Sequence, residues 1–358
     1  MGRPKSELRN EMRLRTQLLS WYDAQRRDLP WRRTSDPYAI WVSEIMLQQT
    51  RVAVVIDRFT AFLERFPTID ALARAQEDDV LALWSGLGYY RRARMLHKAA
   101  RLVAEQLDGR LPETAKELRD LPGIGSYTAA AIASIAHGER VAVVDGNVER
   151  VLCRLAGWEF NGDEGAGALR KKVEHLATSL VDPRRPGDFN QAMMELGATV
   201  CLPRNPQCQG CPIVAHCATR GEHATPPRPR MRNREVSYAL ATRVRNSRGG
   251  DWREVLLERR SASETVMPGM WELPAANNAG EQPQISLRHA IMQVNYTVRV
   301  HTLAEKDAGA LVAPPSSRRW IALQDLPSLP LTGLARKVLI RAHLLPAESR
   351  RSPRSTSI

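Results

Sequence analysis

The sequence lacks any apolar run of about eighteen residues, the length that a membrane-spanning helix needs, and its first ten residues are polar and basic. We therefore expect no membrane segment, no signal peptide and a cytoplasmic protein. Acidic residues are scarce relative to basic ones: 39 Asp and Glu stand against 52 Lys and Arg, which gives a formal net charge of +13. This surplus, mostly arginine, suits a partner that carries many phosphates.

Cysteine is also rare, with five in the chain, and so few in a cytosolic protein argue against a disulfide framework. Cys153 stands alone in an apolar stretch and is expected to be an inert core thiol. Cys201, Cys208, Cys211 and Cys217 follow a Cys-x6-Cys-x2-Cys-x5-Cys spacing, and four thiolates so close in sequence can surround one centre. We favour a [4Fe-4S] cluster over a four-cysteine zinc site, because structural zinc sites usually pair two close knuckles and here one pair forms such a knuckle.

No strand-like alternation precedes residue 235 or so, and the apolar residues recur at helical spacing. We expect a mainly α-helical part over residues 1–223, including the cysteine loop (201–217). Residues 224–234 are rich in Pro and Arg and are expected to be a linker. Residues 235–346 alternate apolar and polar side chains and predict a smaller α+β domain, and residues 347–358, rich in Ser and Arg, predict a disordered tail.

Individual elements follow from the same periodicities. Helices are expected over residues 8–22, 38–66, 79–107, 128–136, 147–155, 166–180 and 189–200. Strands are expected over residues 236–244, 254–259, 296–303 and 319–323.

A tight Gly-x-Gly turn lies in Leu121-Pro-Gly-Ile-Gly-Ser-Tyr-Thr-Ala129. Gly123 and Gly125 can both take positive φ and leave no side chain in the way. The free N–H groups of a helix that starts at Ser126 would then face a phosphate oxygen. The alternative is an ordinary corner between two helices, since Pro-Gly pairs mark turns widely.

Two carboxylates are candidates for catalysis. Glu44 is expected on a mostly apolar helical face shared with Ile40, Trp41, Leu47 and Gln48. Burial there would raise its pKa and allow it to donate a proton near neutral pH, whereas on an exposed face it would be an ordinary surface glutamate. Asp145 follows the glycine turn, and it is also a suitable N-cap for a helix from Asn147.

Taken together, the glycine turn, the following Asp145, the four-cysteine loop and the Glu44 segment resemble the adenine DNA glycosylases of the MutY family. The resemblance is strong over about residues 15 to 220 and weak beyond. It implies a helix-hairpin-helix glycosylase fold with an iron-sulfur loop, followed by a Nudix-like domain. It also implies a monomer that removes adenine mispaired with 8-oxoguanine or guanine in double-stranded DNA.

The resemblance assigns roles to individual residues. Glu44 would protonate adenine N7 and help to activate water, Asp145 would stabilise the oxocarbenium-like sugar, and Tyr127 and Asn147 would support them. A flipped base needs a pocket and a wedge. The residues implied for binding adenine, the opposite base or the DNA are Trp31, Arg32, Gln48, Gln49, Thr50, Leu87, Tyr89, Gly123, Gly125, Gln191 and Gln293.

Position 127 separates two classes of related glycosylases. Those that also cut the DNA strand carry a lysine there, whose amine attacks the sugar, but this chain has Tyr127. We therefore expect hydrolysis without strand cutting. The alternatives are a strand-cutting glycosylase for oxidised pyrimidines, which Tyr127 and Glu44 disfavour, and a mismatch-binding protein without catalysis, which the pairing of Glu44 with Asp145 disfavours.

The second domain departs from the family pattern. Met267-Pro-Gly-Met-Trp-Glu-Leu-Pro274 resembles a Nudix-like segment, but no Arg-Glu-x-x-Glu-Glu run follows to hold magnesium. In family members a Phe-Ser-His loop reads 8-oxoguanine, and here Ile291, Met292 and Gln293 fall on those positions. Methionine cannot supply the hydrogen bonds of serine. Discrimination between 8-oxoguanine and guanine would therefore be weaker, or it would depend on Gln293, Asn295, Thr50 and Leu87.

Overall fold

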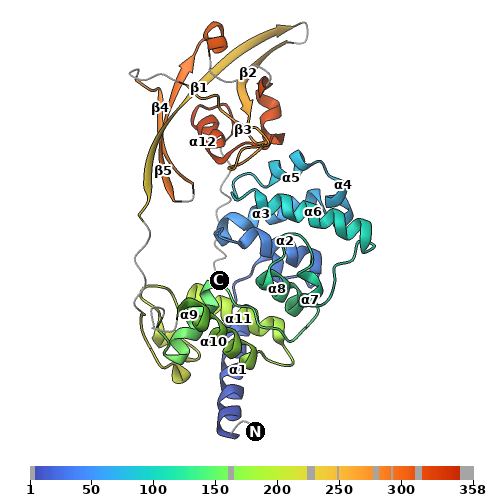
Figure 1. Cartoon of the computed structure of the whole chain (residues 1–358), viewed down its shortest axis with the longest axis vertical. Coiled ribbons are helices and arrows are strands. Elements are labelled where there is room, and N and C mark those ends of the chain that lie inside the picture. Colours follow the sequence, from blue (N-terminus) through green and yellow to red (C-terminus); the bar gives the residue numbers. More distant parts are fainter. Residues whose placement is uncertain are drawn as a thin grey trace, which may run out of the picture. The chain divides into compact units, whose positions relative to one another are not determined.

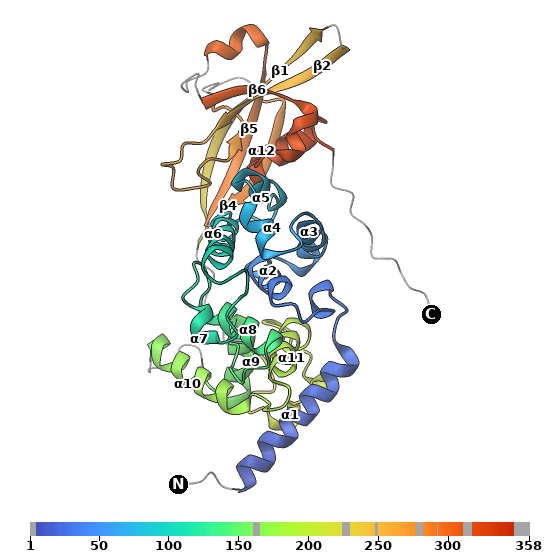
Figure 2. The same cartoon turned by 90° about the vertical axis from the view of Figure 1, so that its right-hand side faces the viewer.

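The computed structural model describes residues 5–159, 165–223, 230–247, 250–276, 282–291, 293–310 and 317–346. By mutual contacts the chain divides into two compact units. The first comprises residues 1–74 and 95–228, and the second comprises residues 75–94 and 229–358 (Figures 1 and 2). None of the described helices combines the length and apolar character that crossing a membrane requires.

The first unit is helical, as expected. Its elements are α1 (Lys5–Gln25), η1 (Pro30–Arg32), α2 (Pro37–Leu47), α3 (Val52–Arg65), α4 (Ile69–Arg74), α6 (Arg91–Gln106, whose first turn belongs to the second unit), α7 (Ala115–Leu118), α8 (Ser126–Ala136), α9 (Gly146–Ala156), α10 (Gly165–Leu180), α11 (Pro186–Thr199), η2 (Cys208–Gly210) and η3 (Val214–His216). Local signals set their ends. The side chain of Asp36 accepts hydrogen bonds from the first turn of α2, and Gly157 ends α9 in the left-handed conformation with φ 73°.

Two of the expected helices are each broken in two. The stretch 38–66 forms α2 and α3, separated at Gln48–Arg51, where Gln49 has a φ of 56°. The stretch 79–107 forms α5 (Glu77–Leu83) and α6, and Gly86, Gly88 and Tyr89 between them all have positive φ. Apolar periodicity continues across each break, so the sequence pattern alone merged the helices.

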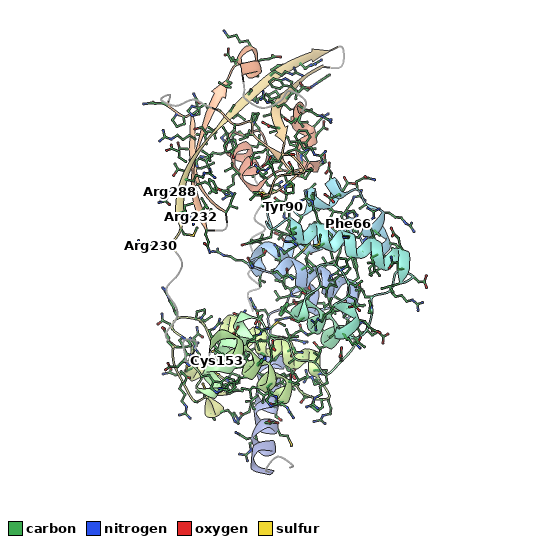
Figure 3. All side chains as sticks on the ribbon, viewed as in Figure 1. Phe66, Tyr90, Cys153, Arg230, Arg232 and Arg288 are labelled. Carbon is green, nitrogen blue, oxygen red and sulfur yellow. The ribbon has the colours of Figure 1, made fainter. Side chains whose placement is uncertain are left out.

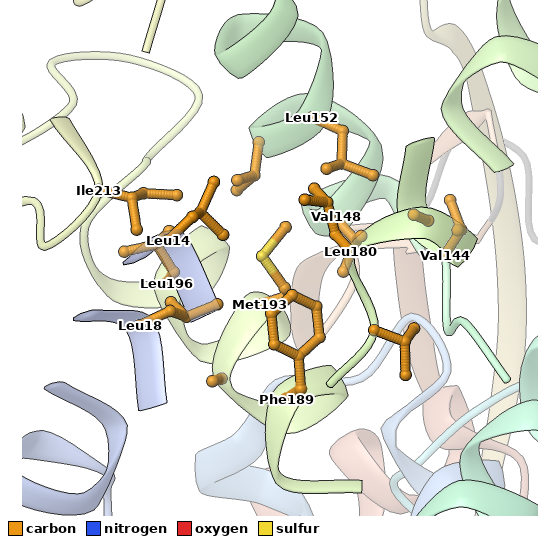
Figure 4. Close-up of a cluster of buried hydrophobic side chains, with 14 of the residues drawn as sticks. Leu14, Leu18, Val144, Val148, Leu152, Leu180, Phe189, Met193, Leu196 and Ile213 are labelled. Carbon is orange, nitrogen blue, oxygen red and sulfur yellow. The ribbon is translucent and has the colours of Figure 1, made fainter. Parts of the chain in front are cut away.

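Helices α1, α9, α10 and α11 build a core of the first unit (Figure 4). Leu14 and Leu18 of α1 meet Met193 and Leu196 of α11, and Leu152 of α9 completes the contact. Cys153, the isolated cysteine, is fully buried in this core, and burial raises the pKa of its thiol to about 11 (Figure 3). This packing fixes α9 against α11, and both helices carry residues of the candidate site.

The second unit is an α+β structure, as expected. Its strands are β1 (Arg232–Ser247), β2 (Gly250–Arg259), β3 (Trp271–Glu272), β4 (Ile285–Ile291), β5 (Val294–Leu303) and β6 (Arg318–Ala322), and its helices are α5, η4 (Glu305–Ala310), η6 (Leu323–Ser328) and α12 (Gly333–Arg341). The sheet order is β3-β2-β1-β5-β4, and β6 also pairs with β2. Strands β1 and β5 are parallel, whereas the other pairs are antiparallel.

Helix α12 covers one face of this sheet, where Leu334 and Val338 pack with Val298 and Val300 of β5 (Figure 1). Segment 75–94 also belongs to this unit. In it, Tyr90 donates its hydroxyl to the carbonyl of Leu331 at 3.1 Å.

The expected linker is described only in part, and the expected tail lies outside the described residues. Strand β1 begins at Arg232, so the last three residues of the expected linker 224–234 lie in a strand, while residues 224–229 and the tail 347–358 are not among those described. Strands β3 and β4 were not expected from the sequence. Strand β3 has two residues, and β4 shows an ordinary alternation that was interpreted as part of a recognition loop.

Candidate active site

The glycine turn precedes α8, as expected, but its two glycines differ. Gly123 has a φ of 79°, and a Cβ there would lie 2.5 Å from the Cβ of Met95, so a side chain is excluded. Gly125 was expected to use positive φ as well, and this was wrong: it is the extended N-cap of α8 with a φ of −86°. Nothing within 4 Å would meet a Cβ on Gly125, so the approach to the first turn of α8 is open.

The first turn of α8 has backbone N–H groups that suit an anion. The first bond within α8 runs from the N–H of Ala129 to the carbonyl of Gly125 at 2.9 Å. The N–H groups of residues 126–128 precede it and have no acceptor within the helix. Together with the positive end of the helix dipole, they suit a phosphate oxygen.

Glu44 lies on α2 and is buried, with 5% of its surface exposed. Tyr127 at the start of α8 donates its hydroxyl to Glu44 Oε2 at 2.7 Å. Burial raises the pKa of Glu44 to about 7; the Tyr127 hydrogen bond and the charge of Arg32 oppose this rise, and the charge of Asp145 adds to it. Burial and the two carboxylates also raise the pKa of Tyr127, so its hydroxyl remains a donor.

Asp145 is positioned from both sides of its carboxylate. Its Oδ1 accepts the N–H of Val148 at 2.7 Å and so caps α9, which begins at Gly146. Its Oδ2 accepts from the amide of Asn147 at 3.1 Å. Asp145 is therefore a helix cap and a member of the site at once, because it also acts electrostatically on Glu44.

A polar chain continues from Asp145 to the cysteine loop. Asn147 Oδ1 accepts from Arg150 at 2.9 Å, and Arg150 donates to the carbonyls of Gly197 at 2.7 Å and Cys201 at 2.9 Å. Sequence patterns did not identify Arg150, because two of its acceptors are backbone carbonyls that lie about 50 residues away in the chain.

Asn190, also missed, orients the segment that leads to Asp145. Its amide oxygen accepts the N–H of Val143 at 3.1 Å, and its amide nitrogen donates to the carbonyl of Val141 at 2.8 Å and to Ser134 at 3.0 Å. A buried asparagine with three such bonds ties this segment to α8 and α11. A polar residue within the apolar pattern of α11 was the only sequence signal for it.

Two of the residues implied for the adenine pocket lie on η1, which precedes α2. Trp31 is buried against Phe59 in an edge-to-face contact, with ring centroids 5.6 Å apart. Arg32 donates to Glu195 Oε2 at 2.8 Å, and its guanidinium lies 5.4 Å from the ring centre of Tyr22. Glu195 is a buried carboxylate that sequence analysis did not identify.

Four other implied residues of the first unit lie on α11 or directly after α2. Gln48 ends α2 and donates to Thr128 at 3.2 Å. Gln49 is exposed with positive φ, which a non-glycine residue rarely adopts. Thr50 is half-buried and donates to the carbonyl of Gln48, and Gln191 is half-buried on α11.

Three implied residues belong to the second unit. Leu87 is buried, whereas Tyr89 is 50% exposed with a φ of 47°, and the guanidinium of Arg92 lies 5.5 Å from its ring centre. Gln293 lies in the two-residue connection between β4 and β5, and its carbonyl accepts from the N–H of Arg232 at 2.8 Å.

The expected recognition loop is therefore a tight hairpin. Ile291 ends β4 and pairs with Val294, and Met292 lies outside the described residues. Arg230, Arg232 and Arg288 lie at this end of the sheet (Figure 3).

The four cysteines of the loop 201–217 are partly buried and form no disulfide. Burial, together with the charges of the other three cysteines, raises the pKa of Cys211 to about 11 against a backbone hydrogen bond from Ile213, so the four thiols interact. In the parts of the chain that the structure describes, no three Cys, His, Asp or Glu side chains are arranged to hold a metal ion.

Arg154 points into the same region. It is 2% exposed and donates to Cys201 Sγ at 3.4 Å and to the carbonyls of Leu202 and Pro203 at 2.7 and 3.0 Å. The N–H of Arg220 also points to Cys217 Sγ at 3.4 Å. Donors directed at sulfur favour thiolates, so the chemistry of this loop fits an anionic metal centre.

Comparison with known proteins relates this arrangement to base-excision enzymes. Residues 42–179 match the model of the HhH-GPD superfamily of base excision DNA repair proteins. The chain is similar to the adenine DNA glycosylase of Homo sapiens, at 36% identity over 90% of this chain and 73% of the human protein. The adenine DNA glycosylase of Mus musculus is also 36% identical, over 93% of this chain and 78% of the mouse protein.

Solved structures share the helical fold. A thermostable thymine-DNA glycosylase has a TM-score of 0.53 and 30% identity, over 60% of this chain and 99% of its own. An endonuclease III trapped as a covalent intermediate with DNA has a TM-score of 0.50 and 23% identity, over 61% of this chain and 98% of its own, which is a likeness of fold alone.

Proposed function

Because the chain belongs to the adenine DNA glycosylase family, we propose that it hydrolyses the N-glycosidic bond of adenine mispaired with 8-oxoguanine or guanine in double-stranded DNA. It is a DNA glycosylase of the HhH-GPD superfamily of base excision repair. The observation that carries the proposal is the buried Glu44, which is hydrogen-bonded to Tyr127 and within electrostatic range of Asp145.

Glu44 supplies the proton that adenine needs in order to leave. The proton moves from the carboxyl group to adenine N7 while the bond between the sugar C1′ and adenine N9 breaks, and the bonding electron pair goes to the base. With a pKa of about 7, Glu44 is protonated below neutral pH and loses its proton as the pH rises above that value. Excision is therefore expected to slow above about pH 7.

Asp145 stabilises the cationic sugar that remains. Its hydrogen bonds to Val148 and Asn147 fix its carboxylate, so it need not reorganise when positive charge develops. The ionised Glu44 then removes a proton from a water molecule that attacks C1′, which restores the acid and leaves an abasic sugar.

Tyr127 makes the reaction stop at this point. Its hydroxyl has a raised pKa and bonds to Glu44, so it is no nucleophile for the sugar. A strand-cutting relative would use a lysine amine here. The DNA strand is consequently left intact at the abasic site.

Two further parts of the first unit have proposed roles in binding, the first turn of α8 for DNA and the cysteine loop 201–217 for an iron-sulfur cluster. The first turn of α8 would hold a backbone phosphate. The four cysteines of the loop 201–217 would hold a [4Fe-4S] cluster, which supplies structural cross-linking of the loop when bound. Arg154 would donate to one of its thiolate ligands, and iron and sulfide analysis of the purified chain separates this cluster from zinc.

Recognition of the opposite base differs from the family pattern. Ile291 ends β4, and Gln293 lies in the connection to β5. Of these two residues, Gln293 is exposed and has a side chain that can form hydrogen bonds. We expect discrimination between 8-oxoguanine and guanine to be weaker than a Phe-Ser-His loop provides. Equal excision rates from the two duplexes support this expectation, and a large preference for 8-oxoguanine contradicts it.

Single-turnover reactions with duplexes that contain A opposite 8-oxoguanine, G, C or T test the proposed function. We expect free adenine and an intact abasic strand from the first two duplexes, and slow release from the A:T pair. Borohydride added during the reaction should trap little covalent adduct. Release of thymine or an oxidised pyrimidine instead of adenine, or a high yield of adduct, contradicts the proposal.

A further inference from the structure

Glu195 is a buried carboxylate of α11 that the proposed reaction does not use directly. It is 1% exposed, and both of its oxygens are engaged. Oε1 accepts from Arg27 Nε at 2.7 Å and from the backbone N–H of Arg27 at 3.1 Å, and Oε2 accepts from Arg27 at 2.7 Å and Arg32 at 2.8 Å. Burial acts to raise the pKa of Glu195, but the two arginines outweigh it and lower the pKa to about 2. Glu195 therefore remains charged at every pH of interest.

The two arginines differ in freedom. The Arg27 side chain is 39% exposed, whereas that of Arg32 is 10% exposed. Arg32 also donates to the carbonyl of Arg27 at 3.1 Å and lies over the ring of Tyr22. Arg27 can turn to solvent when its partner is lost, but Arg32 is held on several sides.

Arg32 connects this cluster to the acid, because η1, which carries Arg32, packs against α2, which carries Glu44. The groups that act on Glu44 are Tyr127 on α8, Asp145 before α9 and Arg32 on η1. Helix α3, which also packs on α2, buries apolar residues. The positive charge of Arg32 favours ionisation of Glu44, and Glu195 is the carboxylate that compensates this charge.

We propose that Glu195 is a positioning residue for base excision, which holds Arg32 in place and compensates its charge so that Glu44 keeps its proton. The inference rests on the proposed function. It assigns a role to a carboxylate that does not contact the reacting atoms. Of these three residues, Arg32 is the one that acts on Glu44. Loss of Glu195 leaves the charge of Arg32 less compensated, and loss of Arg27 leaves Glu195 to compensate Arg32 alone.

Two substitutions should move the pH dependence of excision in opposite directions. Glu195→Gln leaves more positive charge near Glu44, lowers its pKa and moves the decline of the rate to lower pH. A shift of about one unit reduces the rate roughly tenfold at about pH 8 and leaves the rate at about pH 5 nearly unchanged. Arg27→Met leaves Glu195 to compensate Arg32 alone, so the decline of the rate moves to higher pH.

Two controls separate charge from structure. Glu195→Asp keeps the negative charge, so the excision rate should decline at the same pH as in the wild type, even if the rate is lower at every pH. Asp28→Asn removes a carboxylate from the same loop, but Asp28 is 71% exposed and bonded to the exposed Arg33, so solvent screens the change and no shift is expected.

The experiment is the pH profile of single-turnover adenine release for the full-length wild type and these four variants. Opposite shifts for Glu195→Gln and Arg27→Met support the inference. An equal slowing of Glu195→Gln at every pH, or an Arg27→Met profile that stays in place or moves down, overturns it. If Glu195→Gln fails to fold, the Arg27→Met profile still decides. A wild type that releases no adenine refutes the proposed function itself, which is a different result.

Discussion

Replacing Gly197 with alanine is expected to slow catalysis strongly while the protein remains folded. Gly197 lies where α11 meets α9, and an added Cβ would lie 2.7 Å from the Cβ of Asn147 and 3.1 Å from its carbonyl oxygen. Carbon atoms in ordinary contact are about 3.5 Å apart, so the helices must separate by roughly 0.8 Å. Asn147 orients Asp145 through a hydrogen bond and accepts from Arg150, so this displacement reaches the carboxylate that we propose stabilises the sugar.

Each effect has an expected size. Overpacking costs about 1–3 kcal/mol, and the better helix propensity of alanine offsets about 0.5–1 kcal/mol of it. The net loss of unfolding free energy is therefore about 0–2.5 kcal/mol. A displacement approaching 1 Å of a group that must stabilise a transition state reduces the rate by up to about 100-fold.

Single-turnover adenine release and urea unfolding measure the two effects on the same samples. Gly167→Ala is the matched control, because Gly167 lies on α10 and an added Cβ would meet nothing within 4 Å. This control should be at least as stable as the wild type and equally active. A Gly197→Ala variant with the full excision rate would refute the proposed coupling between α11 and Asp145.

Three further predictions concern the same residues. Tyr127→Phe removes the hydrogen bond that lowers the pKa of Glu44, so the pH profile of excision should move to higher pH; a downward move would contradict the assigned bond. Glu44→Gln should raise the free energy of unfolding by roughly 3 kcal/mol at about pH 8 and hardly change it at about pH 4, as measured by urea unfolding. The reason is that the pKa of Glu44 is about 7 in the folded state against 4.5 for an ordinary glutamate, so ionisation of Glu44 destabilises the folded state as the pH rises between these values. Asn190→Ala should destabilise the chain by about 3 kcal/mol, since it leaves buried partners without hydrogen bonds, whereas Gln191→Ala on the same helix should cost under about 1 kcal/mol; equal losses would show that the Asn190 bonds matter little.

Local patterns indicated the surroundings of two site residues. The apolar helical face around Glu44 left burial and exposure both open, and the structure shows that Glu44 is buried, while Asp145 has the capping role that its neighbours indicated. The helical first unit and the α+β second unit followed from periodicity. The breaks at Gln49 and Tyr89 were missed because apolar spacing continues through them while positive φ at a non-glycine residue leaves no compositional mark.

The sequence did not predict which polar side chains pair with residues far away in the chain. Glu195 meets Arg27 and Arg32 across more than 160 positions, and neither partner has a pattern that identifies the other. Asn190 reads as an ordinary polar helix residue until its contacts with Val141 and Val143 are known. The extended conformation of Gly125 likewise depends on its role as the cap of α8, which glycine content alone does not specify.

The central claim is that Glu44 is the acid that releases adenine. It is tested most directly by single-turnover reactions of Glu44→Gln with an A:8-oxoguanine duplex, alongside measurement of the affinity for the same duplex. Glutamine keeps the shape and can accept from Tyr127, but it has no proton to transfer, so binding should persist while adenine release falls by at least about 100-fold. Release of adenine at close to the wild-type rate would show that Glu44 is not the acid.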